Sequence, residues 1–412
     1  MSKITLINFS GGDRPGLTSS LTDILASHHL RILDIGQAVV HETLALAILI
    51  EIPVGQEFTP LKRDLIVRAH ELDLKIKFTP VTEAGFEHWV RSQGKLRFII
   101  SVLGRVITAE ELARVSAAIS KHGLNIDRIE RLSGRLSLSG RAEDAKACIE
   151  LEISGEDDSS TALRAELMQL THEFEVDIAF QRESIYRRNR RLVAFDMDST
   201  LIQAEVIDEL AKLHGVGDKV SAITAAAMRG ELDFKASFTQ RVALLRGLPS
   251  KRLQELLHSV QLADGAERLV STLKMLGYKT AILSGGFTFF GKHLQARLGI
   301  DYVFANDLEI EEGVLTGNAG SEIVDGKKKA ELLENIARRE NISLDQVVAV
   351  GDGANDLPML NIAGMGIAFH AKPLVRQSAK HSVSHLGLDS ILYLIGVRDR
   401  DLDRAGFGSG GG

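Results

Sequence analysis

The chain has 412 residues, more than one ordinary domain contains, so we expect about two to four domains. Hydrophobic residues make up 44% and charged residues 25%, close to the average of globular proteins, which excludes wholesale disorder, a collagen-like chain and a disulfide scaffold. The net charge of −6 argues against a general nucleic-acid-binding protein and favours small-molecule partners.

The sequence carries no pattern typical of membrane insertion or export. The longest apolar run, Leu44 to Ile50, is far shorter than the roughly 18 residues that a membrane-spanning helix needs. No apolar signal core follows Met1, and a lone Cys148 cannot form an internal disulfide. We therefore expect a cytoplasmic protein with no membrane partner.

Two units of similar pattern occupy the first 190 residues. Residues 1–82 alternate apolar strand and helix patterns in the order β-α-β-β-α-β, and residues 95–184 repeat that order. Thr108 and Glu111 form a capping-box pattern at the start of the first helix of the second unit. The order of elements predicts two ferredoxin-like α+β domains.

Three further segments are predicted to link or end these domains. Residues 83–94 contain Trp89 in a polar setting and are interpreted as a connector. The basic run from Tyr186 to Arg191 is interpreted as a solvated linker, with a nucleic-acid patch as the less favoured alternative. The tail from Gly406 has almost no side chains with which to fold and is typical of a flexible linker.

From Leu192 onward, short apolar strands alternate with helical stretches, which predicts a parallel α/β sheet. We expect residues 192–395 to fold on their own. The predicted strands are Leu192 to Phe195, Lys279 to Leu283, Tyr302 to Ala305, Val347 to Val350, and Gly366 to Ala368.

Acidic residues follow the first of these strands. Asp196 and Asp198 stand directly after Phe195, so they lie at the carboxyl end of a parallel strand, where ligands bind in open α/β sheets. Two carboxylates so close repel each other, and a hard divalent cation such as Mg²⁺ relieves the repulsion. On this pattern alone, a surface turn with an Asx cap is an equally good interpretation.

The strand ending at Val350 leads into a second acidic turn, with Asp352 and Asp356 four residues apart. Gly351 and Gly353 allow the backbone to approach a ligand closely. A dinucleotide-binding turn is disfavoured because the G-x-G-x-x-G pattern is absent.

Two other segments carry groups that bind phosphate. Ser284, Gly285 and Gly286 follow a strand and offer a hydroxyl and backbone N–H groups. Lys327 to Lys329 precede an amphipathic helix that is predicted to begin near Ala330, and either one lysine reaches the site or the triplet is solvated.

These four motifs, DMDST, SGG, KKKA and GDGAND, resemble in type, order and spacing those of the haloacid dehalogenase superfamily of phosphohydrolases. The resemblance implies a Rossmann-like doubly wound parallel sheet with a helical cap. It also implies that Asp196 is the nucleophile and Asp198 the general acid and base. Mg²⁺ would be held by the Asp196 and Asp352 carboxylates and the Asp198 main-chain oxygen, supported by Asp356.

Phosphate and substrate contacts also follow from the resemblance. Ser284, Gly285, Lys329 and Asn355 would contact the phosphoryl group or substrate, and Lys329 is chosen among the three lysines because the family lysine directly precedes a small residue.

Within the superfamily, the stretch from Glu205 onward resembles the helical cap of phosphoserine phosphatases, at about residues 205–260 of the 192–395 domain. Glu205 would bind the ammonium of O-phosphoserine and Arg241 its carboxylate, since an arginine bonds carboxylate bidentately. Without the resemblance, both would be interpreted as surface charges on helices.

The two N-terminal units resemble ACT domains, which commonly bind amino acids. Gly12, Asp13 and Gly16 match the ACT turn and could receive a carboxylate at a helix start, with L-serine as the expected effector. The second unit departs from the pattern at residues 104–108, so a scaffold for a homodimer or other homo-oligomer is the alternative use.

The sequence therefore predicts an enzyme, a phosphatase of serine biosynthesis that acts on O-phosphoserine. A phosphatase for another small phosphomonoester is the first alternative. A non-catalytic amino-acid sensor is the second, and it is disfavoured because all the expected acids are present.

Overall fold

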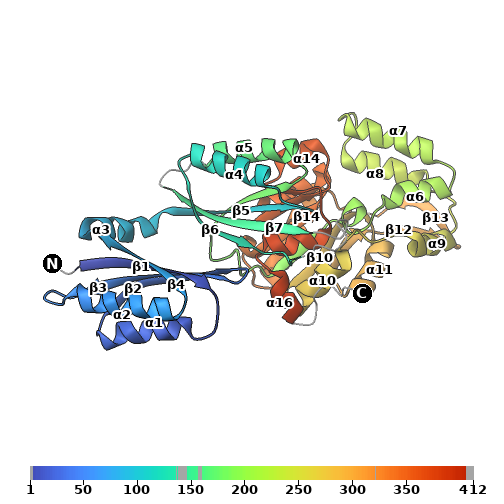
Figure 1. Ribbon diagram of the computed structural model, residues 1–412. Coiled ribbons are helices and arrows are strands. Elements are labelled where there is room, and N and C mark those ends of the chain that lie inside the picture. The colour runs from blue at the N-terminus through green and yellow to red at the C-terminus, as the bar shows by residue number, and fades with distance from the viewer. Residues whose placement is uncertain (1–2, 136, 138–145, 156–159, 321, 405–412) are drawn as a thin grey trace. The chain divides into compact units, whose positions relative to one another are not determined.

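The computed structural model describes residues 3–135, 137, 146–155, 160–320 and 322–404. The chain consists of two compact units, residues 1–95 and 96–412 (Figure 1). The glycine-rich tail from Gly406, predicted to be a linker, lies outside the described residues. In the described part of the chain, no helix is both long and apolar enough to cross a membrane.

The first unit is one antiparallel sheet, in the order β2-β3-β1-β4, with helices α1 and α2 over one face. Leucines at i and i+4 of α1, namely Leu17, Leu21 and Leu25, are buried against alternate residues of β3 such as Leu46 and Ile48. The elements are β1 (Lys3–Gly12), α1 (Leu17–Ser27), β2 (Arg31–Val40), β3 (Thr43–Ile52), α2 (Phe58–Glu71), β4 (Leu74–Val81) and α3 (Glu83–Arg91). The predicted connector around Trp89 is thus a helix, α3.

The second unit begins with a sheet of the same topology, in the order β6-β7-β5-β8, as the sequence predicts. The capping box is confirmed: Thr108 Oγ1 accepts the N–H of Glu111, whose carboxylate accepts the N–H of Thr108. The elements are β5 (Leu96–Gly104), α4 (Ala109–Lys121), β6 (Asn125–Arg131), β7 (Ala147–Gly155), α5 (Ser160–Glu173) and β8 (Asp177–Arg182).

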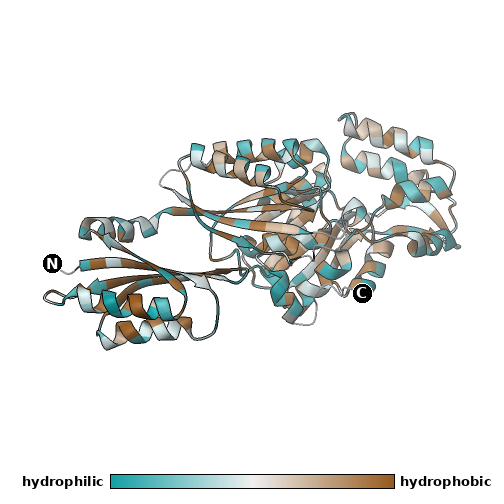
Figure 2. Ribbon diagram, viewed as in Figure 1, coloured by the Kyte–Doolittle hydropathy of each residue, from teal (hydrophilic) through white to brown (hydrophobic). Residues whose placement is uncertain are grey.

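A six-stranded parallel sheet follows, in the order β11-β10-β9-β14-β15-β16, and it confirms the predicted α/β class. Figure 2 shows hydrophobic residues along its strands, as expected for a sheet buried on both faces. The strands are β9 (Leu192–Phe195), β10 (Lys279–Phe287), β11 (Tyr302–Asn306), β14 (Val347–Gly351), β15 (Met365–Phe369) and β16 (His381–Val383).

Between β9 and β10 the chain forms the helical cap, which agrees with the predicted insertion. Its helices are α6 (Val206–Leu213), α7 (Gly217–Met228), α8 (Phe234–Ala243) and α9 (Lys251–Ser259). A two-stranded hairpin of β12 (Leu308–Glu311) and β13 (Val314–Ala319) also contacts α8.

The remaining helices flank the parallel sheet. They are α10 (Ala266–Met275), α11 (Thr288–Leu298), α12 (Gly326–Arg339), α13 (Leu357–Ile362), α14 (Pro373–Ser378), α15 (Ile391–Leu394) and α16 (Asp399–Arg404). Helix α12 begins four residues earlier than predicted, because Asp325 caps it by accepting the N–H of Lys328 at 2.8 Å. The lysine triplet therefore lies in the first turn of the helix.

The second ACT-like sheet shares a hydrophobic core with the parallel-sheet domain. Leu103, Cys148 and Ala179 point away from α4 and α5 and belong to the same buried cluster as Phe195 and Val350. The expectation that residues 192–395 fold on their own stays a prediction. The structure shows that these residues form their own parallel sheet and that one face of the second ACT-like sheet completes their core.

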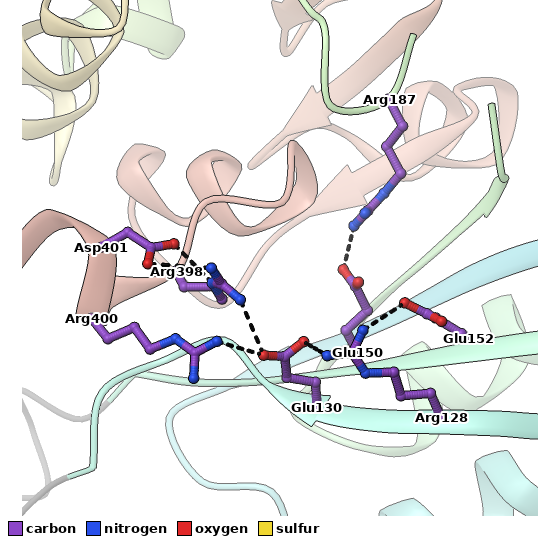
Figure 3. Close-up of polar contacts among 8 residues, drawn as sticks. All are labelled: Arg128, Glu130, Glu150, Glu152, Arg187, Arg398, Arg400 and Asp401. Atoms are coloured by element: carbon purple, nitrogen blue, oxygen red, sulfur yellow. Dashed lines mark hydrogen bonds and ion pairs between the residues drawn. The ribbon is translucent and has the colours of Figure 1, made fainter. Parts of the chain in front are cut away.

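Polar contacts reinforce this shared core (Figure 3). The buried Arg187 side chain pairs with Glu150 of β7, and Arg398 and Arg400 pair with Glu130 of β6. Arg190 is also buried and bonds the main-chain oxygen of Asp345. The interpretation of the 186–191 run as a solvated linker is therefore wrong for two of its arginines: Arg187 bonds the second sheet, and Arg190 bonds the segment just before β14.

Candidate active site

The predicted catalytic groups meet at the carboxyl edge of the parallel sheet. Asp196 follows β9, Asp352 and Asp356 follow β14, and Ser284 lies in β10, the neighbour of β9 on the other side. Strands β10, β9 and β14 are adjacent and parallel, so residues remote in sequence come together at one edge.

Lys329 lies at the centre of this group. Its side chain is fully buried, and its Nζ is 2.9 Å from Asp196 Oδ1 and 2.7 Å from Asp356 Oδ1. The two carboxylates raise the pKa of Lys329 above its ordinary value despite its burial, so it stays charged. Lys328 instead pairs with Glu322 near the surface.

Asp196 is surrounded by groups that fix one of its two carboxylate oxygens. Its Oδ1 accepts the N–H of Met197 at 2.7 Å and contacts Lys329. Burial, followed by the charge of Asp356, raises the pKa of Asp196, and Lys329 opposes that rise. Neither of these contacts involves Oδ2.

Asp198 is held by the start of the cap. Its Oδ1 accepts the N–H of Val206, the first residue of α6, at 3.2 Å. Burial, followed by the charge of Glu205, raises the pKa of Asp198 to about 8. A carboxyl group with such a pKa carries a proton at neutral pH and can donate it.

Three carboxylates form a potential metal site. One oxygen from each of Asp196, Asp352 and Asp356 lies within 4.8 Å of the others, and oxygen ligands of this kind suit a hard divalent cation. Burial, then the charge of Asp356, raises the pKa of Asp352 to about 7. The Asp356 carboxylate thus stands beside the two predicted metal-binding carboxylates.

Two positions at the site require glycine because neighbouring atoms lie too close to leave room for a side chain. A Cβ at Gly286 would lie 2.3 Å from Asp198 Oδ2, and one at Gly285 would lie 2.8 Å from the Phe234 ring of the cap. The Gly286 N–H donates to Ser284 Oγ at 2.8 Å. Half-buried Asn355 lies in the turn after β14.

The two predicted substrate residues lie on the cap side of the site. Glu205 precedes α6 and accepts a hydrogen bond from Ser199 Oγ at 2.8 Å. Desolvation by neighbouring protein atoms raises the pKa of Glu205, and the hydrogen bond from Ser199 opposes that rise. Arg241 on α8 is half-buried, and the charges of Asp208, Glu205 and Asp198 act on its guanidinium, so the structure brings Glu205 and Arg241 together.

Two residues at the site have no role in the sequence-based prediction. The buried Thr200 donates to Asp352 Oδ1 at 3.4 Å, and exposed Lys372, just after β15, acts electrostatically on Glu205. Thr200 stands within the first motif, and Lys372 follows a strand of the sheet. Their positions close to the ends of strands are the features of the sequence that could have identified them as site residues.

The turn predicted to bind an amino acid belongs to the first unit. Gly16 has φ +90° and precedes α1, whose N-terminus has no side-chain cap. The Asp13 N–H donates to the main-chain oxygen of Glu42, and the turn is exposed.

Comparisons with known proteins agree with this arrangement. Residues 190–364 match the haloacid dehalogenase-like hydrolase family, and residues 3–79 and 97–181 each match ACT domains. A phosphoserine phosphatase of Streptomyces coelicolor is 42% identical over 403 residues, which is 97% of this chain and 94% of that protein. The phosphoserine phosphatase SerB2 of Mycobacterium tuberculosis is 37% identical over 412 residues, covering 98% of this chain and 96% of its own.

Solved structures give the same result. A haloacid dehalogenase family hydrolase of Salmonella enterica serovar Typhi superimposes with a TM-score of 0.61 at 32% identity, covering 73% of this chain and 99% of its own. A probable phosphoserine phosphatase of Vibrio cholerae gives 0.57 at 32% identity, covering 74% and 88%. The chain therefore belongs to the phosphoserine phosphatase family, as a haloacid dehalogenase-like hydrolase with two ACT domains ahead of its catalytic domain.

Proposed function

We propose that this enzyme hydrolyses O-phospho-L-serine to L-serine and phosphate, the last step of serine biosynthesis, through an aspartyl-phosphate at Asp196. The observation that carries the proposal is the direct pairing of Asp196 with Lys329, together with a cap in which Glu205 and Arg241 act on each other electrostatically. The relatives named phosphoserine phosphatase, which match almost the whole chain, support it.

In the first step, Asp196 Oδ2 attacks the phosphorus atom and the bond from phosphorus to the serine oxygen breaks. Asp198 donates its proton to that departing oxygen, in keeping with its raised pKa. Lys329, Ser284 and the N–H groups around Gly285 stabilise the charge that develops on the phosphoryl oxygens.

In the second step, water attacks the phosphorus atom of the aspartyl-phosphate. Asp198, now a carboxylate, takes a proton from this water, and the bond from phosphorus to Asp196 breaks. Inorganic phosphate leaves, and both aspartates return to their starting protonation states.

We propose Mg²⁺ as the metal, held by the carboxylates of Asp196, Asp352 and Asp356 and by the main-chain oxygen of Asp198. Their clustered oxygens fit a hard cation, and Thr200 supports Asp352. When bound, the cation neutralises charge on the phosphoryl oxygens.

We further assign the two polar ends of the substrate to the cap. Glu205 receives the ammonium and Arg241 the carboxylate, and Asn355 contacts the substrate from the turn after β14. Ser199 fixes one Glu205 oxygen, which reduces the freedom that this side chain loses on binding.

Phosphate release from a panel of substrates tests the function. With Mg²⁺, we expect O-phosphoserine to exceed O-phosphoethanolamine, 3-phosphoglycerate and ethyl phosphate by at least about a hundredfold in kcat/KM, and chelation should abolish turnover. Asp196→Asn should lower kcat by more than about a thousandfold while leaving the melting temperature within a few degrees. A preference for another phosphomonoester would replace the substrate assignment, and no turnover of any would favour the sensor alternative.

We also propose that the ACT units bind a small amino acid, L-serine, and that they support a homo-oligomer. The support is the exposed turn of Gly12, Asp13 and Gly16 at an uncapped helix N-terminus, where main-chain N–H groups can receive a carboxylate. Regulation requires that L-serine bind two states of the enzyme unequally.

Inhibition kinetics test this role in the full chain. We expect L-serine to inhibit with a component that saturating O-phosphoserine does not remove, and Asp13→Ala to abolish that component alone. If inhibition is wholly competitive, the sensing role is wrong. Sedimentation of the same samples then shows whether the enzyme is an oligomer.

A further inference from the structure

Two buried polar atoms in the cap lack hydrogen-bond partners among the described residues, and they are complementary. Asp208 Oδ1, in the first turn of α6, is an acceptor, and Arg241 Nε, on α8, is a donor. Neither atom is reached by solvent. A buried polar atom without a partner lowers stability, so a complementary pair of such atoms on two helices of one cap calls for a functional explanation.

Asp208 also dominates the electrostatic surroundings of Arg241. Burial lowers the pKa of Arg241, and among the carboxylates that oppose this, Asp208 has a larger effect than Glu205 or Asp198. Asp208 stands three residues after Glu205, and its N–H donates to the Glu205 main-chain oxygen at 3.1 Å. One turn of chain thus carries both Glu205, which is assigned to the ammonium, and Asp208, the carboxylate with the largest electrostatic effect on the guanidinium of Arg241.

The planar shape of the guanidinium explains how a carboxylate at Nε can assist the binding of a ligand. Arginine recognises a carboxylate with two parallel hydrogen bonds, which requires the plane of the guanidinium to be fixed. An acceptor at Nε fixes that plane and leaves both terminal nitrogens for a ligand. A guanidinium without this anchor must be ordered when the ligand binds, which lowers affinity.

We propose that Asp208 is a positioning residue for Arg241: in the substrate complex its carboxylate accepts the Nε–H of Arg241 and so aligns the two terminal nitrogens with the substrate carboxylate. The inference rests on the proposed function, since it deepens the role of Arg241 there. Asp208 itself does not touch the substrate.

A double-mutant cycle on the full-length enzyme tests the proposal. In the parent, Asp208→Asn should lower kcat/KM for O-phosphoserine about tenfold, mostly through KM, because the amide keeps an acceptor but loses the charge. Asp208→Leu, which removes the acceptor at similar volume, should cost about a hundredfold. In an Arg241→Ala background, both changes should alter kcat/KM less than about twofold, because the residue that Asp208 acts on is gone.

Substrate analogues separate this role from its alternatives. The loss should appear with 3-phosphoglycerate, which keeps the carboxylate, and should be absent with O-phosphoethanolamine, which lacks it. A loss confined to the two ammonium-bearing substrates would overturn the proposal and make Asp208 an ammonium ligand. Equal losses with all substrates, or additive losses in the cycle, would show a merely structural role.

The matched control is Glu209→Gln, an acid-to-amide change at the next residue of α6, where Glu209 pairs with Lys212 at 2.6 Å. This change should leave kcat/KM unaltered for O-phosphoserine, O-phosphoethanolamine, 3-phosphoglycerate and ethyl phosphate. O-phosphoethanolamine turnover by each Asp208 variant reports on folding in the same sample. If the parent itself does not prefer O-phosphoserine, the proposed function fails; if it does and Asp208→Asn is neutral, only the present inference fails.

Discussion

The two aspartates proposed as catalytic differ in the groups that contact one oxygen of each. Asp196 Oδ1 contacts Lys329 and the Met197 N–H, whereas Asp198 Oδ1 accepts the main-chain N–H of Val206 at the start of α6. Lys329 pairs directly with Asp196 and acts on Asp198 only at longer range. This difference favours the carboxylate form of Asp196, the proposed nucleophile, over that of Asp198, the proposed proton donor.

Asp198→Asn therefore should impair both chemical steps, because an amide neither protonates the serine oxygen nor accepts a proton from water. We expect kcat to fall by more than about a hundredfold, and phosphorylated enzyme to accumulate if the second step suffers more. Rapid acid quench with labelled substrate measures that species. Unchanged kinetics would show that another group moves the proton.

His381 provides a prediction for stability at low pH. It is buried in β16, and burial, followed by the charges of Arg164, Arg190 and Lys380, lowers its pKa to about 3. Between pH 6.5 and 3 the unfolded chain therefore binds a proton that the folded chain refuses, so the free energy of unfolding falls as the pH falls through this window.

We expect this histidine to account for a loss of about 2 kcal/mol between pH 7.5 and pH 5.0. Urea unfolding of His381→Gln at both values should show a smaller pH-dependent loss than the parent by that amount. His258→Gln, the same change at an exposed position of α9, is the control and should follow the parent. Parallel curves for the parent and His381→Gln would refute the assignment.

At the scale of elements, strand β7 is joined to the chain before β9 by a buried ion pair. The side chains of Arg187 and Glu150 are 3% and 4% exposed, and burial raises the pKa of Glu150 while Arg187 opposes the rise. Nearby Glu130 of β6 is 21% exposed, and its partner Arg400 is 61% exposed (Figure 3). One carboxylate is thus inside the contact between the sheets and the other is at its rim.

Glu150→Gln should lower the free energy of unfolding by about 3 to 5 kcal/mol, because it leaves the Arg187 charge buried without its partner. Glu130→Gln, the matched change at the rim, should cost less than about 1 kcal/mol. Chemical denaturation of both variants measures the difference. Equal small losses would mean that water reaches Arg187 in solution.

At the scale of the whole molecule, the catalytic domain depends on the second ACT sheet for part of its core. Leu103, Leu132 and Cys148 cluster with residues of the parallel-sheet domain. One face of the catalytic domain is therefore covered by a sheet from the part of the chain that precedes it.

Truncation should therefore have different effects at two positions. A fragment starting at Leu96 keeps the shared core, and we expect its kcat/KM for O-phosphoserine to stay within about threefold of the parent. A fragment starting at Leu192 exposes apolar surface, so we expect a lower melting temperature and aggregation, which light scattering and dye binding detect. Equal stability of the two fragments would contradict an essential shared core.

The sequence by itself determined the features that depend on neighbouring residues. Alternating and i, i+4 apolar patterns define the strands and helices, and acids directly after apolar strands place Asp196 and Asp352 at one sheet edge. The tertiary structure decided which charges are buried. Lys329 rather than Lys328 meets the aspartates, Arg187 enters an interface, and Asp208 comes under the influence of Arg241, because burial and pairing depend on contacts between segments far apart in the chain.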